Sequence, residues 1–168
     1  MEKRVKQGYY KSGKRAEAKG RRIRGKPKRP WRERQGEWTE LRFMSEAVRR
    51  GFTVLRPWNR SSVYDVVLEQ GRRFPRVQVK SAGLARKLKW ARPERGAIYV
   101  FNTRRHEGGY RKGNIDFYAL YIVPRDVWYI VPYADIGAVQ ILCVFPDSRK
   151  HRLERYRGAW ELLYGAGE

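Results

Sequence analysis

The feature that most constrains the fold is a pair of alternating runs near the middle of the chain, residues 63–69 and 76–81, joined by a short turn. In each run apolar side chains take every second position, as in strands with one face against a core. The short connection predicts that the two runs pair as antiparallel neighbours. The sequence therefore predicts a central hairpin with one apolar face and one polar face.

The polar face of this hairpin gathers an acid, an amide and an amine. If the turn centres between Gly71 and Arg72, residues opposite each other sum to 143, so Asp65 lies opposite Gln78 and Lys80 follows on the same face. Antiparallel neighbours on one face lie about 5 Å apart. A slip of one residue would move the whole polar set to the other face of the sheet.

This polar set suits a hard divalent cation. Asp65 supplies a carboxylate, Gln78 an amide oxygen and Val79 a backbone carbonyl, which are the ligand types that Mg²⁺ prefers. A cation there would activate water and neutralise charge on a phosphodiester, and the Lys80 ammonium would stabilise the same charge. Glu40, on a helix before the sheet, either completes this site or is an ordinary solvated acid. The pattern indicates hydrolysis of a nucleic-acid backbone with Mg²⁺, for which Mn²⁺ is a substitute.

The charge of the chain favours a polyanionic partner. It carries 39 Lys and Arg against 17 Asp and Glu, a formal net charge of +22. Residues 1–34 hold a cationic surplus of 12 and residues 35–168 a surplus of 10, so the excess is not confined to one end. Contacts with phosphates release counterions, which makes nucleic acid the natural partner. The alternative is a merely solvated cationic surface. The segment 82–95 is expected to hold the nucleic-acid backbone through Arg86, Lys87, Lys89 and Arg92.

The chain is expected to form one α/β domain, residues 35–168, after a basic tail. Residues 1–34 lack hydrophobic periodicity and are expected to be disordered in isolation. Helical spacing predicts a helix over 36–50, ended by Gly51, and a C-terminal helix over 152–164. Between them we expect a mixed sheet of five or six strands. Seven apolar runs are candidates for these strands, namely 52–55, 63–69, 76–81, 97–101, 117–123, 127–131 and 139–145.

Cysteine content and hydropathy favour a cytoplasmic protein. Cys143 is the single cysteine, so no internal disulfide can form, which fits a reducing compartment. The longest apolar runs are too short to cross a bilayer, and the N-terminus lacks the apolar stretch of a secretory signal. We therefore expect no membrane contact.

Taken together, these residues resemble the PD-(D/E)XK nuclease superfamily. The resemblance is carried by Glu40 on the first helix and by the segments 61–65 and 77–81. It is strongest for the branch that contains group I intron homing endonucleases and weaker for archaeal Holliday junction resolvases. Segments 38–47 and 114–121 also resemble that branch, and the resemblance spans about residues 36–136. It implies a restriction-endonuclease-like core.

The resemblance also implies roles for individual residues. Asp65 and Gln78 would be metal ligands, Glu40 would assist the metal, and Lys80 would be the catalytic lysine. The commonest pattern has an acid where this chain has Gln78, which is an accepted variant in the homing-endonuclease branch. The substitution removes one negative charge, so weaker metal binding is expected.

The implied partner is double-stranded DNA, cut by a homodimer or homotetramer because two strands require two sites. Ser61 or Ser62 resembles a serine near the active site of the resolvases, and with Arg60 these residues are assigned to the nucleic-acid contact. Asp116 lies in a matching segment without an assigned role. Three alternatives stay open, namely a non-catalytic binding protein on the same fold, a junction-specific resolvase and a basic RNA-binding protein.

Overall fold

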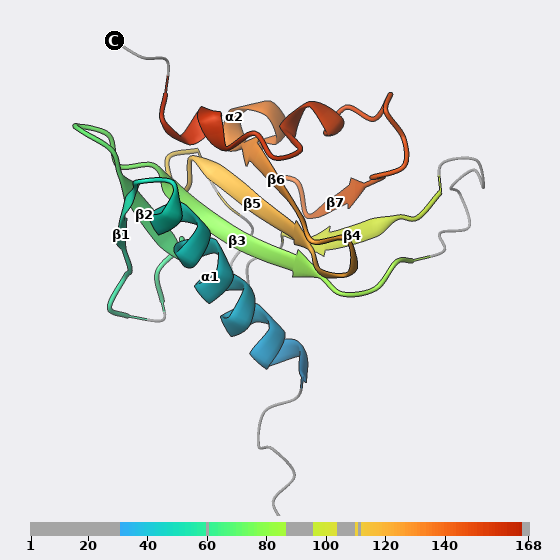
Figure 1. Cartoon of the computed structure of the whole chain (residues 1–168), viewed down its shortest axis with the longest axis horizontal. Helices are drawn as coiled ribbons and strands as arrows, with labels where there is room; N and C mark the ends of the chain where they lie inside the picture. The colour runs from blue at the N-terminus through green and yellow to red at the C-terminus, as the bar shows by residue number, and fades with distance from the viewer. Residues whose placement is uncertain (1–30, 60, 87–95, 104–109, 111, 166–168) are drawn as a thin grey trace, which may run out of the picture.

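The computed structural model describes residues 31–59, 61–86, 96–103, 110 and 112–165 (Figure 1). Every strand expected from the apolar runs is present, and the expected α/β class is confirmed. In chain order the elements are α1 (Trp31–Arg49), β1 (Thr53–Leu55), β2 (Val66–Glu69), β3 (Arg76–Ala82), β4 (Tyr99–Asn102), β5 (Phe117–Ile122), η2 (Val123–Arg125), β6 (Val127–Pro132), α2 (Tyr133–Ile136), β7 (Ile141–Val144), η3 (Glu154–Tyr156) and η4 (Trp160–Leu163).

The strands form two sheets. Five of them make a mixed sheet in the order β1-β2-β3-β5-β6, in which β3 and β5 run parallel and the other neighbours antiparallel. The other two, β4 and β7, pair with each other as a separate antiparallel sheet. The mixed sheet of five strands agrees with the expectation, whereas the runs at 97–101 and 139–145 form a second layer.

The register of the central hairpin is the predicted one. Val66 pairs with Val77 and Val67 with Arg76, so each pair sums to 143. Val66, Leu68, Val77 and Val79 are all buried in one hydrophobic cluster, as the alternation requires. The polar residues that alternate with them are therefore held at fixed positions along β3.

Two hydrophobic clusters lie on opposite faces of the five-stranded sheet. On one face α1 lies across the strands (Figure 1), and Phe43 packs against Trp128 and Trp160. On the other face the two-stranded sheet packs against the alternate side chains of β5, such as Leu120. The sheet is thus covered on both sides, and β3, which carries Gln78 and Lys80, is its central strand. No helix in the described part of the chain is long and apolar enough to span a bilayer.

Helix α1 starts earlier than expected. It begins at Trp31, so residues 31–34, which were assigned to the tail, are helical. Its buried positions Gln35, Thr39, Phe43 and Ala47 recur every four residues, which is one face of a helix. Residues 1–30 lie outside the described residues.

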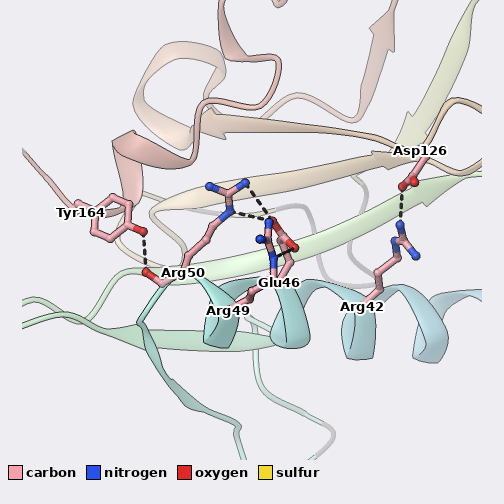
Figure 2. Close-up of polar contacts among 6 residues, drawn as sticks. All are labelled: Arg42, Glu46, Arg49, Arg50, Asp126 and Tyr164. Carbon is pink, nitrogen blue, oxygen red and sulfur yellow. Dashed lines mark hydrogen bonds and ion pairs between the residues drawn. The ribbon is translucent and has the colours of Figure 1, made fainter.

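Polar contacts fix α1 against the rest of the domain (Figure 2). The Arg42 guanidinium lies 2.5 Å from the Asp126 carboxylate in the β5–β6 turn, and the Tyr164 hydroxyl donates to the Arg50 carbonyl at 2.8 Å. Glu40 precedes Arg42 by two residues, so it projects from the opposite flank of the helix because successive residues are turned by about 100°. The anchored helix therefore holds Glu40 on the side away from Asp126.

The prediction of a single C-terminal helix over 152–164 is wrong. Two 3₁₀ helices, η3 and η4, take its place. Gly158 separates them with a φ of +62°, a left-handed conformation that ends a helix, and its N–H donates to the Trp128 carbonyl at 2.8 Å. The spacing did report burial correctly, because Tyr156, Trp160 and Leu163 are buried.

Candidate active site

The candidate site lies where β2 and β3 part at the start of β2. The Asp65 N–H donates to the Val77 carbonyl at 3.0 Å, which is the last backbone bond of the ladder on this side. One step further the Val79 N–H donates at 2.8 Å to the Asp65 carboxylate instead of to a backbone carbonyl. Because the N–H and C=O of one strand residue point to the same side, the Val79 carbonyl also faces this space.

The two polar side chains of β3 lie beside Asp65. Gln78 is buried, and its amide nitrogen donates to the same carboxylate oxygen of Asp65 that accepts from Val79. Lys80 follows two residues later and is half-buried. Its ammonium lies close enough to lower the pKa values of both Asp65 and Glu40. The structure therefore brings Glu40, Asp65, Gln78 and Lys80 to one place.

Glu40 reaches the site from α1 and is paired with Arg56. The Arg56 guanidinium lies 3.0 Å from the Glu40 carboxylate. Arg56 follows directly after β1, and its contribution was not foreseen from the sequence. The only sequence signal for a role of Arg56 is its position as a basic residue just after the strand that precedes the hairpin, and that signal is weak.

The electrostatics of the two carboxylates favour a cation between them. Burial raises the pKa of Glu40, and the neighbouring Asp65 charge raises it further, against the lowering effects of Arg56 and Lys80. Burial also raises the pKa of Asp65, and the Val79 N–H, Lys80 and Gln78 oppose that rise. Both carboxylates therefore lie in surroundings that disfavour the ionised form, and a cation bound between them would stabilise that form.

A groove of about 590 Å³ opens onto these carboxylates. It is partly formed by the loop after β1, in which the Ser62 hydroxyl donates to the Asn59 side-chain oxygen at 2.8 Å. The residues that line it are Glu37, Glu40, Arg56, Pro57, Trp58, Asn59, Ser62, Tyr64 and Asp65. Ser62 therefore lies beside the acids, whereas the neighbouring Ser61 is exposed and is not among the lining residues.

The expected nucleic-acid contacts are only partly visible. Arg86 is exposed and its backbone N–H donates to the Ile98 carbonyl at 2.7 Å, which joins the end of the β3 region to β4. The other four basic positions assigned to this contact lie outside the described residues. They are Arg60, Lys87, Lys89 and Arg92.

Asp116, which received no role from the sequence, ties β5 to β3. Its carboxylate accepts from the Arg76 backbone N–H at 2.8 Å and from the Arg76 guanidinium at 3.1 Å. Its own N–H donates to the Arg76 carbonyl at 2.9 Å. Arg76 starts β3, so this contact sits before the site residues and sets the start of the parallel β3–β5 pairing.

The donor set fits a hard cation such as Mg²⁺. Among the described residues, no group of three or more His, Cys, Asp or Glu side chains is placed to hold a metal. Two carboxylates suffice for Mg²⁺, which keeps several of its waters, and the Val79 carbonyl and the Gln78 amide add neutral oxygens. The Gln78 amide nitrogen faces Asp65, because a carboxylate can only accept hydrogen bonds. Rotation of the amide would exchange its nitrogen and oxygen without changing the shape of the side chain, and would present the oxygen to a cation.

An acid pair and a lysine at one place on this fold are groups that metal-assisted phosphodiester hydrolysis would use, which suits a nuclease. The chain belongs to the PD-(D/E)XK endonuclease family, whose model matches residues 32–163. The family expected from the sequence is thereby confirmed, and its members use divalent metal ions.

A solved structure supports the same fold. The bacterial homing endonuclease I-Ssp6803I is similar over 79% of this chain and 92% of its own, with 24% identity and a TM-score of 0.66. Hjc, a Holliday junction resolvase from Archaeoglobus fulgidus, is similar over 80% of this chain and 99% of its own, with 15% identity and a TM-score of 0.47. A search of curated proteins finds no match.

Proposed function

We propose that this nuclease is an endonuclease that hydrolyses phosphodiester bonds of DNA with Mg²⁺, and that Mn²⁺ can replace Mg²⁺. The observation that supports the proposal best is the convergence of Glu40, Asp65 and Lys80 beside one groove. Two carboxylates in surroundings that disfavour their ionised forms would gain from a bound cation. The ammonium beside them would interact with the phosphate that the cation also contacts.

Each residue of the cluster has a distinct task in this proposal. Asp65 and Glu40 hold the ion, with further oxygens from Gln78 and the Val79 carbonyl. When bound, Mg²⁺ lowers the pKa of a water and offsets charge on the phosphate. The Val79 N–H keeps the Asp65 carboxylate in place, and the Lys80 ammonium stabilises the charge that develops on the phosphate oxygens.

DNA is favoured as the substrate, and a multimer as the active form. One neighbour in fold is a homing endonuclease, and the surplus of basic residues in 35–168 supplies attraction to phosphates. The tail and the segment 82–95 are proposed to contact the nucleic-acid backbone. The described part of the chain offers one such site, and a homodimer or homotetramer would place a site on each strand of a duplex.

Incubation of the full chain with supercoiled plasmid tests this proposal. We expect nicked and then linear DNA with MgCl₂ or MnCl₂, and no product in EDTA. A parallel series with linear duplex, a four-way junction, single-stranded DNA and structured RNA identifies the substrate. Retarded migration without cleavage of any of these nucleic acids, at every metal concentration, would contradict the proposal and indicate a binding protein.

The Gln78→Glu variant is expected to bind Mn²⁺ more tightly than the native chain and to be less stable without it. The new carboxylate would face Asp65 in a buried position, so the free energy of unfolding in EDTA should fall by about 1–3 kcal/mol. A cation would relieve that repulsion. Calorimetric titration with Mn²⁺ and urea unfolding measure the two effects.

The matched control for this variant is Gln140→Glu, which adds the same charge at an exposed position. It should leave both the Mn²⁺ affinity and the stability near those of the native chain. Equal Mn²⁺ affinity in Gln78→Glu and the native chain would show that residue 78 does not face the ion.

A further inference from the structure

Trp58 is the most exposed large apolar side chain that the described residues contain. Its relative exposure is 103%, against 79% for Leu84 and 52% for Phe74. A single exposed apolar residue on a protein surface needs no explanation. Trp58 differs because it lines the groove that also holds Glu40 and Asp65.

The loop that carries Trp58 is tied to the candidate site before the indole and is closed by a hydrogen bond of its own after it. Before it, Arg56 forms its 3.0 Å ion pair with Glu40, and Pro57 fixes its own φ. After it, the Ser62 hydroxyl donates to the Asn59 side chain at 2.8 Å. The backbone of Trp58 is therefore held beside the acids while its ring remains in solvent.

The chemistry of this arrangement matches a nucleotide at the cleavage position. The phosphate of such a nucleotide would lie at the acid and lysine cluster, and its base would lie within reach of the groove wall. An exposed indole offers an apolar planar surface that gains most from a flat aromatic partner. Bases stack on aromatic side chains in this way when they are unpaired or easily unstacked.

We propose that Trp58 stacks on a nucleobase next to the scissile phosphate and gives the protein a preference for DNA that is unpaired or distorted at that point. The inference rests on the proposed nuclease function and names the substrate feature that the same site recognises. Removal of one stacking aromatic commonly weakens binding by roughly 5- to 100-fold. The preference for a distorted site should therefore depend on residue 58.

Equilibrium binding in EDTA tests this inference without cleavage. The probes are a fully paired 30-base-pair duplex and the same duplex with a central bulge of three nucleotides that contains 2-aminopurine. We expect the native chain to bind the bulged duplex about 5- to 100-fold more tightly and to quench the 2-aminopurine fluorescence. Trp58→Ala should bring the ratio of the two Kd values close to one and leave the probe bright, whereas Trp58→Phe should keep part of both effects.

Phe74→Ala is the matched control, because Phe74 is an exposed aromatic residue in the turn at the other end of β2. It should retain the full preference for the bulge. Equal affinities of the native chain for both probes, or a preference that survives in Trp58→Ala, would overturn the inference. Because no step of this assay needs a metal, a failure of the proposed nuclease activity would appear separately in the plasmid assay.

Discussion

The Asp65→Asn variant is expected to lose phosphodiester cleavage by roughly 10³-fold or more, about 4 kcal/mol of activation free energy. The substitution keeps the shape of the side chain and an oxygen that can accept from the Val79 N–H, but it removes the charge on which ion binding depends. Single-turnover cleavage of plasmid at saturating MgCl₂ measures the loss.

The same variant should be at least as stable as the native chain in the absence of metal. Burial raises the pKa of Asp65 above its value in an unfolded chain, so ionisation costs the folded protein stability as the pH rises through that pKa. An asparagine carries no such cost. Urea unfolding at pH 7 in EDTA should therefore show no loss of unfolding free energy, which separates a defect in catalysis from a defect in folding.

Asp147→Asn makes the same chemical change away from the groove, at an exposed carboxylate paired with Arg125. Exposed ion pairs contribute little to stability, so this control should cut DNA like the native chain. Full activity in Asp65→Asn would refute the assignment of the site, whatever the behaviour of the control.

The Lys80→Ala variant is expected to lower the cleavage rate by about 10²–10³-fold while it keeps or improves Mn²⁺ binding. The ammonium of Lys80 lowers the pKa values of Asp65 and Glu40, so it stabilises the same charges that a cation would. Its removal should make the acid pair a better cation site and a worse catalyst. Single-turnover kinetics and calorimetric titration with Mn²⁺ separate these two effects.

Lys80→Arg is the informative companion, because it keeps the charge but not the compact geometry of an ammonium. Intermediate activity in this variant would indicate that charge supplies part of the effect. A parallel loss of Mn²⁺ binding and cleavage in Lys80→Ala would instead mean that Lys80 is needed to build the site, and the proposed role would be wrong.

The central hairpin was predictable because two independent signals agreed. The alternation of Val66, Leu68, Val77 and Val79 fixed which face was buried, and the short turn fixed the pairing. Once the register is set, the contact between Asp65 and Gln78 follows. This part of the site is local in sequence, which is why pattern alone placed it.

Other features depend on contacts between distant segments, which pattern does not report. Arg56 meets Glu40 only because α1 packs beside β1, and no spacing rule relates the two residues. The pairing of β4 with β7 joins segments about forty residues apart. The C-terminal segment is divided into two 3₁₀ helices by Gly158, which adopts a left-handed conformation. The apolar residues on both sides of Gly158 have helical spacing, so the sequence pattern does not reveal this interruption.

An anomalous-difference map from crystals of the native chain soaked in MnCl₂ tests the central claim most directly. The account predicts one strong peak within about 2.5 Å of carboxylate oxygens of both Asp65 and Glu40. The peak should vanish in Asp65→Asn crystals treated in the same way. A saturating soak that leaves these carboxylates without manganese, or that places the ion elsewhere, would contradict the shared cation site on which the proposed chemistry depends.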